Sequence, residues 1–359
     1  MCATRPDRLV SLFAVGDIYF NRKEETAPYR DMLPLMQRAD IRFCNLEAPV
    51  ALPRDPLPDR PYPLRSPPEN LGLLAQGKFD AIAIAHNHLM DFGVPGMRET
   101  LKYLSDLRQP FTGAGETLAE AMRPIIVESH GMTFGFIAMA CAFPSASGAR
   151  EDAPGIAGLH IDTRYEPLPG LADEHPGIAP RIVTEPDKAG LARLCEAVRL
   201  LKQNADHVIV SFHWGVPGQT AVLDYQRTIA HAVIDAGAVL ILGHHAHVLQ
   251  GVERYANGLI YYGLSHVIFD MPGILSGFGF DAETAAAEIH FSEDGIADAF
   301  IHPFMMDEGE SARTPAKDER ERIGKLLTEL SRPLGTELTY DAGRSAWRIA
   351  KRESVARRA

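Results

Sequence analysis

Residues 240–253 read LILGHHAHVLQGVE, and they place three histidines directly behind a short apolar run. The run AVLIL at 238–242 is apolar on both faces, which is typical of a central strand in a covered sheet. His244, His245 and His247 follow at the carboxyl end of this strand. Imidazoles packed so closely are costly to bury unless they have partners. The stretch therefore predicts a buried strand that delivers histidine ligands to a site.

Other apolar runs have the same character and alternate with helical patterns. Further strands are predicted at 9–15, 41–44, 80–85, 133–140 and 207–212. Amphipathic helices are predicted at 94–107, 186–204 and 224–237, because apolar residues recur three and four positions apart. In the second of these, Pro186 suits the first helical turn. This alternation of strands and helices predicts an α/β layered fold.

The chain changes character after Val248. Asn257-Gly258 and Asp294-Gly295 are typical hairpin turns, so an antiparallel section is predicted there, followed by a helix at 318–332. Residues 51–68 are rich in proline and predict irregular structure. Residues 143–181, rich in proline and glycine, predict either a lid over a site or a surface excursion.

Composition narrows the class of protein. The 359 residues carry a net charge of −11, which disfavours a nucleic-acid partner and leaves a small molecule or a peptide as the expected substrate. The four cysteines form no CxxC pair, which favours a reduced compartment. No apolar run reaches the roughly 20 residues that span a bilayer. We therefore predict a cytoplasmic protein without a membrane anchor, whose oligomeric state the sequence leaves open.

Polar residues follow five of the predicted strands. Ligands of α/β sheets bind just beyond the carboxyl ends of strands. The residues in question are Asp17, Asn45, Glu47, His86, Asn87, His88, Asp91, His213, His244, His245 and His247. Carboxylates, imidazoles and an amide together suit Mn, Fe or Zn. A carboxylate such as Glu47 could bridge two ions, and His245 and His247 could each reach a different one, so a two-metal centre that activates water is predicted.

Several other residues are interpreted as structural. His207 precedes its strand and is predicted to lie on the surface, whereas Trp214 is predicted to pack in the core. The remaining histidines in this group are expected to be ordinary structural or surface residues, namely His130, His160, His175 and His231.

The order of the motifs GD, NLE, NHxxDxG, HWG and GHHxHVxQ resembles the CapA family of bacterial poly-γ-glutamate capsule synthesis proteins. That family is similar to calcineurin-like metallophosphoesterases, and the resemblance runs from about residue 10 to about residue 305. It implies a four-layer α/β/β/α sandwich over residues 1–305. Residues 306–359 are then expected to form a helical extension that packs on the same domain.

The resemblance also implies roles for individual residues. Asp17 and His247 would ligate one metal, and Glu47 would bridge to the other. The remaining ligands of the second metal would be Asn87, His213 and His245. His88 would act as an acid or oxyanion stabiliser, oriented by Asp91.

Three departures from these relatives add candidates. Asp17-Ile18-Tyr19 stands where phosphoesterases have Asp-x-His, a lack that the CapA family shares. His86 and His266 stand where the family has asparagines, and both are candidate acid–base groups or extra ligands. Capsule proteins of this family usually carry a membrane anchor, which this sequence does not show.

Three functions remain open. The first is a soluble hydrolase that uses two divalent metals to cleave a phosphoester or a γ-glutamyl or peptide-type amide, with His88 or His86 assisting the leaving group. The second is a metal-independent epimerase in which Asp17 and His266 move a proton at the α-carbon of an amino acid or peptide. The third is a non-catalytic accessory protein for a polymer or capsule.

Overall fold

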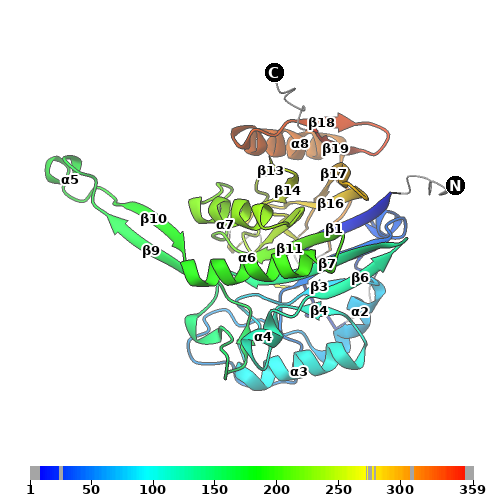
Figure 1. Ribbon diagram of the computed structural model, residues 1–359, viewed down its shortest axis with the longest axis horizontal. Coiled ribbons are helices and arrows are strands. Elements are labelled where there is room, and N and C mark those ends of the chain that lie inside the picture. Colours follow the sequence, from blue (N-terminus) through cyan, green and yellow to red (C-terminus); the bar gives the residue numbers. More distant parts are fainter. Residues whose placement is uncertain are drawn as a thin grey trace.

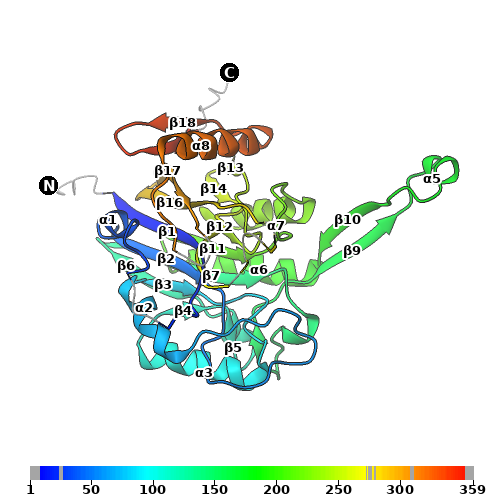
Figure 2. The same ribbon diagram turned by 180° about the vertical axis from the view of Figure 1, so that it is seen from behind.

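Two large sheets form the body of the protein (Figures 1 and 2). The computed structural model describes residues 9–23, 27–271, 273, 277–278, 280–307 and 311–351. The sheets share a core, in which Phe43 of the first sheet stacks on Phe136 of the second at a ring-centroid distance of 5.7 Å. Phe134 of the second sheet and Phe291 of the first sheet also make contact, edge-on, with their ring centroids 5.2 Å apart. The predicted α/β class is confirmed.

The first sheet has nine strands within the described residues, in the order β18-β19-β17-β16-β1-β2-β3-β4, with β15 beside β1. Their bounds are β1 (Val10–Tyr19), β2 (Ile41–Leu46), β3 (Ala81–Ala83), β4 (Phe111–Thr112), β15 (His266–Phe269), β16 (Glu283–Ser292), β17 (Gly295–Met305), β18 (Leu338–Asp341) and β19 (Ala346–Ile349). The hairpin predicted at Asp294-Gly295 is confirmed as the antiparallel pair β16–β17.

Strand β1 changes its neighbour halfway along. Val10–Val15 pairs antiparallel with β16, whereas Asp17–Tyr19 pairs parallel with β15. Gly16 lies at the junction, where an added Cβ would meet the carbonyl oxygen of Ser265 at 2.1 Å. Only glycine allows this close approach of two backbones. The Asp17 N–H donates to the same carbonyl at 3.0 Å, which fixes Asp17 at the opening between strands.

The second sheet has the order β13-β14-β12-β11-β7-β6. Its bounds are β6 (Ile125–Ser129), β7 (Met132–Ala140), β11 (His207–His213), β12 (Leu240–His244), β13 (Val252–Tyr255) and β14 (Gly258–Tyr261). The hairpin predicted at Asn257-Gly258 is confirmed as β13–β14. The central strands β7, β11, β12 and β14 run parallel, so β11 and β12 end at one edge.

Helices α6 (Lys188–Lys202) and α7 (Asp224–Asp235) cover the outer face of the second sheet (Figure 1). Val208 and Val210 of β11 face these helices, whereas Ile209 faces the core between the sheets. Successive side chains of a strand alternate between faces. His213 is four residues beyond Ile209 and therefore turns inward, toward the first sheet.

The helices have the following bounds: α1 (Leu33–Met36), α2 (Leu71–Gln76), α3 (Gly93–Asp106), α4 (Leu118–Ala121), α5 (Leu171–Glu174), α6 (Lys188–Lys202), α7 (Asp224–Asp235) and α8 (Lys317–Ser331). Among the described residues, no helix is both long and apolar enough to cross a bilayer. Pro186 ends a strand rather than opening α6, whose first turn is instead capped by the Asp187 carboxylate, which accepts from the Gly190 N–H at 2.6 Å.

The 143–181 stretch and the C-terminal extension take definite forms. Within 143–181, β8 (Gly155–Ile156) pairs with β5 (Ala114–Gly115). The strands β9 (Ile161–Glu166) and β10 (Arg181–Pro186) form an arm that carries α5 and projects away from the body (Figures 1 and 2). Beyond residue 306, the expected helix α8 is joined by the hairpin β18–β19, which extends the first sheet.

The surface position predicted for His207 is wrong. His207 opens β11 on its inner face and is buried, with its ring 5.2 Å from Phe134 and 5.0 Å from Phe291. The predicted core position of Trp214 is confirmed, since it is buried and stacks on Phe212. Cys44, Cys141 and Cys195 are free thiols, and Cys2 lies outside the described residues.

Candidate metal centre

The predicted site residues converge where the carboxyl ends of the two sheets meet. Asp17 belongs to β1 and Glu47 follows β2, so both come from the first sheet. His213 ends β11, and His245 and His247 follow β12 of the second sheet. The loop after β3 adds Asn87 and His88. Because the sheets pack face to face, residues more than 200 positions apart in the chain come into contact.

Two groups of possible ligands share Glu47. Asp17, Glu47 and His247 form one group, and Glu47, His213 and His245 form the other; within each group the ligand atoms lie within 4.8 Å of one another. The Nε2 atoms of His213 and His247 lie 3.4 and 3.5 Å from Glu47 Oε1. One carboxylate is thus common to both candidate groups.

The Glu47 carboxylate is the most informative feature of the centre. Its side chain is 0% exposed, and among the described residues its oxygens have no hydrogen-bond partner, only the longer contacts with His213 and His247. A buried charge without hydrogen bonds costs several kcal/mol, on the order of 5 or more. Divalent cations would satisfy both oxygens, so the residues present fit a metal.

Asn87 and Asn45 complete the surroundings of His213. The Asn87 Oδ1 lies 2.7 Å from His213 Nε2, so amide and imidazole present ligand atoms to one place. On the other side of the ring, Asn45 Nδ2 lies 3.4 Å from His213 Nδ1 and donates to Asp17 Oδ1 at 2.7 Å. The His245 backbone N–H donates to Asp17 Oδ2 at 3.0 Å. Asn45 therefore orients a carboxylate from one group and an imidazole from the other.

The backbone at two of the histidines is strained. His245 has φ 86° and His247 has φ 53°, values that side-chain-bearing residues seldom adopt. Such conformations cost on the order of 1–3 kcal/mol and cluster at functional sites. The twisted path after β12 separates the two imidazoles, so that each joins a different ligand group.

The charges around the centre favour an ionised Glu47 and a neutral His245, but they favour a protonated His247, which must release its proton before it can bind a metal. Burial raises the pKa of Glu47, but the charges of His247 and His213 outweigh it and hold that pKa well below the usual range. Burial and the His213 charge keep the pKa of His245 well below its usual value. Burial lowers the pKa of His247, but Glu47 and Asp17 reverse the direction and raise it. An ionised carboxylate beside a neutral imidazole suits a divalent cation.

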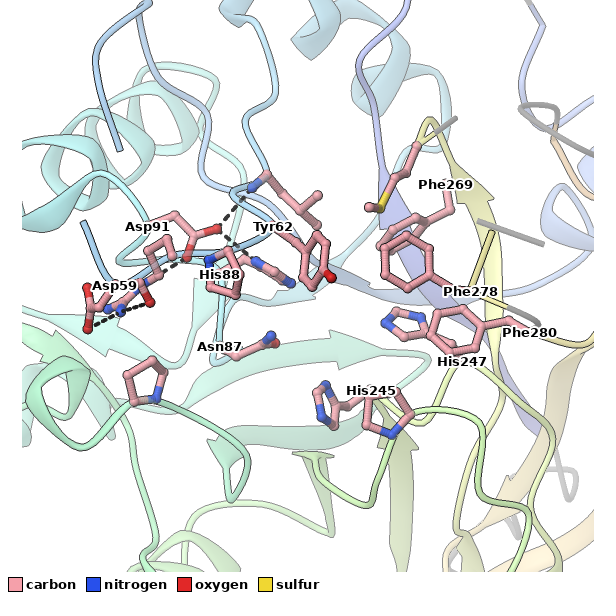
Figure 3. Close-up of a pocket in the computed structure, with 16 residues that line it drawn as sticks. Asp59, Tyr62, Asn87, His88, Asp91, His245, His247, Phe269, Phe278 and Phe280 are labelled. Carbon is pink, nitrogen blue, oxygen red and sulfur yellow. Dashed lines mark hydrogen bonds and ion pairs between the residues drawn. The ribbon is translucent and has the colours of Figure 1, made fainter. Parts of the chain in front are cut away.

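His88 lies at the centre's open side. Its Nδ1 lies 2.7 Å from Asp91 Oδ2, which also accepts from the Leu64 N–H at 2.9 Å. Figure 3 shows the other ring nitrogen directed toward the cavity. The orienting role predicted for Asp91 therefore has a direct geometric basis.

A cavity of about 380 Å³ opens beside the centre (Figure 3). Asn87 and His88 lie on one side of it, and His247 with Phe278 and Phe280 lies on the other. The remaining lining residues are Asp59, Arg60, Pro61, Tyr62, Leu64, Asp91, Pro144, Pro217, His245, Phe269 and Met271. Of the 143–181 stretch, Pro144 thus borders the cavity, whereas the arm points elsewhere.

The two histidines that stand where the family has asparagines, His86 and His266, lie beneath the cavity wall. His86 accepts from the His88 N–H at 3.2 Å and is fully buried, with its pKa held well below its usual value by burial and the His213 charge. His266 is fully buried, 5.5 Å from the His247 ring between centroids, and burial lowers its pKa to about 3. Neither histidine lines the cavity.

The three histidines at the end of β12 and just after it differ in whether they belong to a ligand group. His245 and His247 join the ligand groups, whereas His244 lies on the inner face of β12, with Nδ1 3.4 Å from Asp17 Oδ1. Our interpretation of the sequence placed Asn45 among the polar residues at strand ends but assigned it no specific role, although it lies only two positions before Glu47. It also missed Tyr62, Phe278 and Phe280, because no local motif marks residues of separate loops that meet in space.

The fold and the centre together define an α/β protein with a buried carboxylate–histidine cluster able to hold metal ions. The family model described as bacterial capsule synthesis protein PGA_cap matches residues 11–271, and the chain belongs to this family. It is 25% identical to the capsule biosynthesis protein CapA of Bacillus anthracis, over 90% of this chain and 74% of the relative. It is 27% identical to the PGA biosynthesis protein CapA of Bacillus subtilis (strain 168), over 92% and 80%.

Among solved structures, a hypothetical protein from Thermus thermophilus aligns with a TM-score of 0.47 and 15% identity. The alignment covers 83% of this chain and 100% of the other.

Proposed function

We propose that this chain is a metal-dependent hydrolase that acts on a phosphoester or on a γ-glutamyl or peptide-type amide. The observation that carries the proposal is Glu47, whose buried carboxylate lacks hydrogen bonds and belongs to both ligand groups. Asp17 and His247 would hold one divalent ion, and Asn87, His213 and His245 would hold the second. Mn, Fe and Zn all suit this mixture of oxygen and nitrogen ligands.

Within this proposal, bound ions supply the positive charge that activates a water and polarises the bond to be cleaved. His88 holds a proton near the leaving atom, and its hydrogen bond to Asp91 keeps the ring in that orientation. His86 is a positioning residue, because its ring accepts from the His88 backbone. Asn45 keeps Asp17 and His213 aligned across the two ion sites.

The epimerase alternative has one supporting contact, since Asp17 and His266 are register partners in the pairing of β1 with β15. An acid–base pair must reach the substrate's α-carbon from the cavity. Both side chains are fully buried and neither lines the cavity, and both Asp17 oxygens already accept hydrogen bonds. We therefore prefer the hydrolase. A third alternative is a non-catalytic accessory role for a polymer, which the names of the relatives in capsule and PGA biosynthesis support.

The four-layer α/β/β/α sandwich of metallophosphoesterases is part of the same proposal. We also propose residues 1–305 as one catalytic domain, with 306–359 as an extension packed on it. The pairing of β19 with β17, in which Trp347 is opposite Ile301, supports such packing.

Metal content and turnover test the proposal together. Protein purified without chelator and supplied with Mn²⁺ should hold about two ions per chain. Asp17→Asn should lose about one ion, and Glu47→Gln should lose both, because Glu47 belongs to both groups. The matched control is His175→Ala, an exposed histidine near the tip of the arm, which should retain wild-type metal content.

Hydrolysis of 4-nitrophenyl phosphate and of γ-glutamyl-4-nitroanilide should require the metal and fall by about 10²-fold or more in Glu47→Gln. Wild-type protein that binds no metal under these conditions would contradict the proposal. Uptake of solvent deuterium at a substrate α-carbon by such metal-free protein would support the epimerase instead.

A further inference from the structure

We propose that the cavity beside the metal centre takes an uncharged aromatic group of the substrate, rather than the next carboxylate of a polyanion. This inference rests on the proposed function and adds the class of substrate. It arises from the walls of the cavity, which the proposed chemistry does not use.

The cavity walls are largely apolar. Leu64, Phe269, Met271, Phe278 and Phe280 line them, together with several prolines. The volume of about 380 Å³ falls within the roughly 300–1,000 Å³ of small-molecule sites. Such walls stabilise a ligand by removing its apolar surface from water.

Aromatic rings form a continuous path from the mouth of the cavity to a metal-ligand histidine. Tyr62 meets Phe278 edge-on at a ring-centroid distance of 5.1 Å, and Phe278 stacks on Phe280 at 5.8 Å. Phe280 in turn stacks on His247 at 5.1 Å. Figure 3 shows these rings around the cavity, on the separate loops that hold Tyr62, His247, and Phe278 with Phe280. These separations lie within the 4.5–7 Å that aromatic pairs prefer, so a planar ligand group could join the same path.

The two outermost rings are exposed to solvent. Tyr62 is 58% and Phe278 is 39% exposed, although both lie beside an apolar cavity. Exposed aromatic rings gathered at the rim of a pocket mark binding sites, because a ligand removes their surface from water.

The charges of the cavity oppose an anionic polymer. Arg60 is the one lysine or arginine among the lining residues that the structure describes. Its guanidinium is already paired, at 2.7 Å from Asp59 and 3.3 Å from Asp91. The loop sequence from 271 to 280, MPGILSGFGF, also contains no basic residue. Away from the proposed metal ions, a second carboxylate on the substrate would therefore meet two aspartates that share a single arginine, and no unpaired lysine or arginine among the described lining residues, an arrangement that disfavours it.

Two phosphonates with the same head group test the inference by binding alone. 1-Naphthylmethylphosphonate carries an aromatic group, and phosphonoacetate carries a carboxylate. Calorimetry with Mn²⁺-loaded and metal-free protein gives the ratio of their dissociation constants. We expect the aromatic ligand to bind at least about tenfold more tightly.

Variants connect that preference to the cavity. Phe278→Ala should reduce the ratio severalfold without loss of folding, since Phe278 is partly exposed. Phe278→Arg should reduce it further by attracting phosphonoacetate. The control Tyr165→Ala removes a 68% exposed ring from the arm and should leave the ratio unchanged.

The outcomes separate the inference from the proposed function. Tighter aromatic binding that depends on Phe278 but not on metal supports the inference and contradicts the metal hydrolase. Active, metal-loaded protein that binds phosphonoacetate equally well or better overturns the inference alone. Failure to bind either ligand at millimolar concentration, or a ratio that Phe278→Ala does not change, also overturns it.

Discussion

At the scale of single residues, Glu47 and His266 represent two kinds of buried polar group. Glu47 lies between the two ligand groups, and both of its oxygens lack hydrogen bonds. His266 also has a ring nitrogen without a partner, but it belongs to neither group and does not reach the cavity. A buried polar atom without a partner points to a ligand only where other ligand atoms converge with it.

His266→Asn distinguishes the two catalytic hypotheses. In a metal hydrolase, the variant should retain both metals and lose no more than about tenfold in turnover, because His266 lies behind His247. In an epimerase, loss of the acid–base group should cost about 10²-fold or more. The measurement is metal content, hydrolysis and solvent deuterium uptake in the same preparations. Loss of deuterium exchange with metal content unchanged would decide against the hydrolase.

At the scale of elements, close backbone contacts determine where strands deliver their side chains. Gly16 lets β1 pass the Ser265 carbonyl, so the next residue, Asp17, enters the centre. Gly243 serves β12 in the same way, since an added Cβ would lie 1.9 Å from the Tyr262 carbonyl oxygen. Gly16 and Gly243 lie just before Asp17 and the histidine motif. Glycine is therefore needed at both positions because two backbones pack closely there.

Gly16→Ala should lower the free energy of unfolding by roughly 1–3 kcal/mol, because the backbone of β15 must move away. It should also weaken Mn²⁺ binding by displacing Asp17. The matched control is Gly72→Ala in α2, where an added Cβ meets nothing within 4 Å. Alanine in that helix should stabilise the protein by up to about 1 kcal/mol. Chemical denaturation of both variants measures whether the free energy of unfolding falls in Gly16→Ala and rises in Gly72→Ala.

The arm formed by β9, α5 and β10 is expected to act independently of the centre. Replacing residues 167–180 with an Asn-Gly turn, which suits the pairing of Glu166 with Arg181, should keep metal content and turnover within about twofold. The reason is that the arm projects away from the body (Figure 1). A tenfold loss of turnover in this shortened chain would instead support a cover formed by 143–181.

At the scale of the whole molecule, the C-terminal segment is part of the first sheet. The hairpin β18–β19 pairs with β17, and Arg344, between its strands, forms an ion pair with Glu288 of β16 at 2.6 Å. Glu288 also lies 2.7 Å from His290 and from His302. This cluster ties the C-terminal hairpin to β16 and β17.

The cluster should make stability depend on pH. Burial raises the pKa of Glu288, but hydrogen bonds from His290 and His302 outweigh it and hold that pKa well below the usual range. Its contribution is therefore complete above the unfolded-state pKa of about 4.3 and is lost as pH falls toward the folded-state value. Glu288→Gln should cost about 1 kcal/mol at pH 7, after allowance for solvent screening.

Denaturation of wild type and Glu288→Gln between pH 7 and pH 3 measures this contribution. The difference in unfolding free energy should shrink progressively below about pH 4. A difference that stays constant over the whole range would show that the Glu288 carboxylate contributes no linkage to folding.

The sequence by itself determined the α/β class and the positions from which polar side chains reach the sheet edges. Buried parallel strands are short apolar runs, and the residues that follow them must lie at carboxyl ends, so Asp17, Glu47, His213 and the GHHAH histidines could be found without coordinates. The same local view failed for His207, because the rings that bury it come from other strands, Phe134 from the neighbouring β7 and Phe291 from β16 of the facing sheet.

Tertiary structure alone decided how those positions combine. The division of His245 and His247 between two ligand groups depends on left-handed backbone after β12, and the role of Asn45 depends on the approach of β11 from the other sheet. The aromatic path from Tyr62 to Phe280 joins loops far apart in the chain. Local sequence patterns report which face of its own strand or helix a residue occupies, whereas these contacts depend on how separate elements pack together.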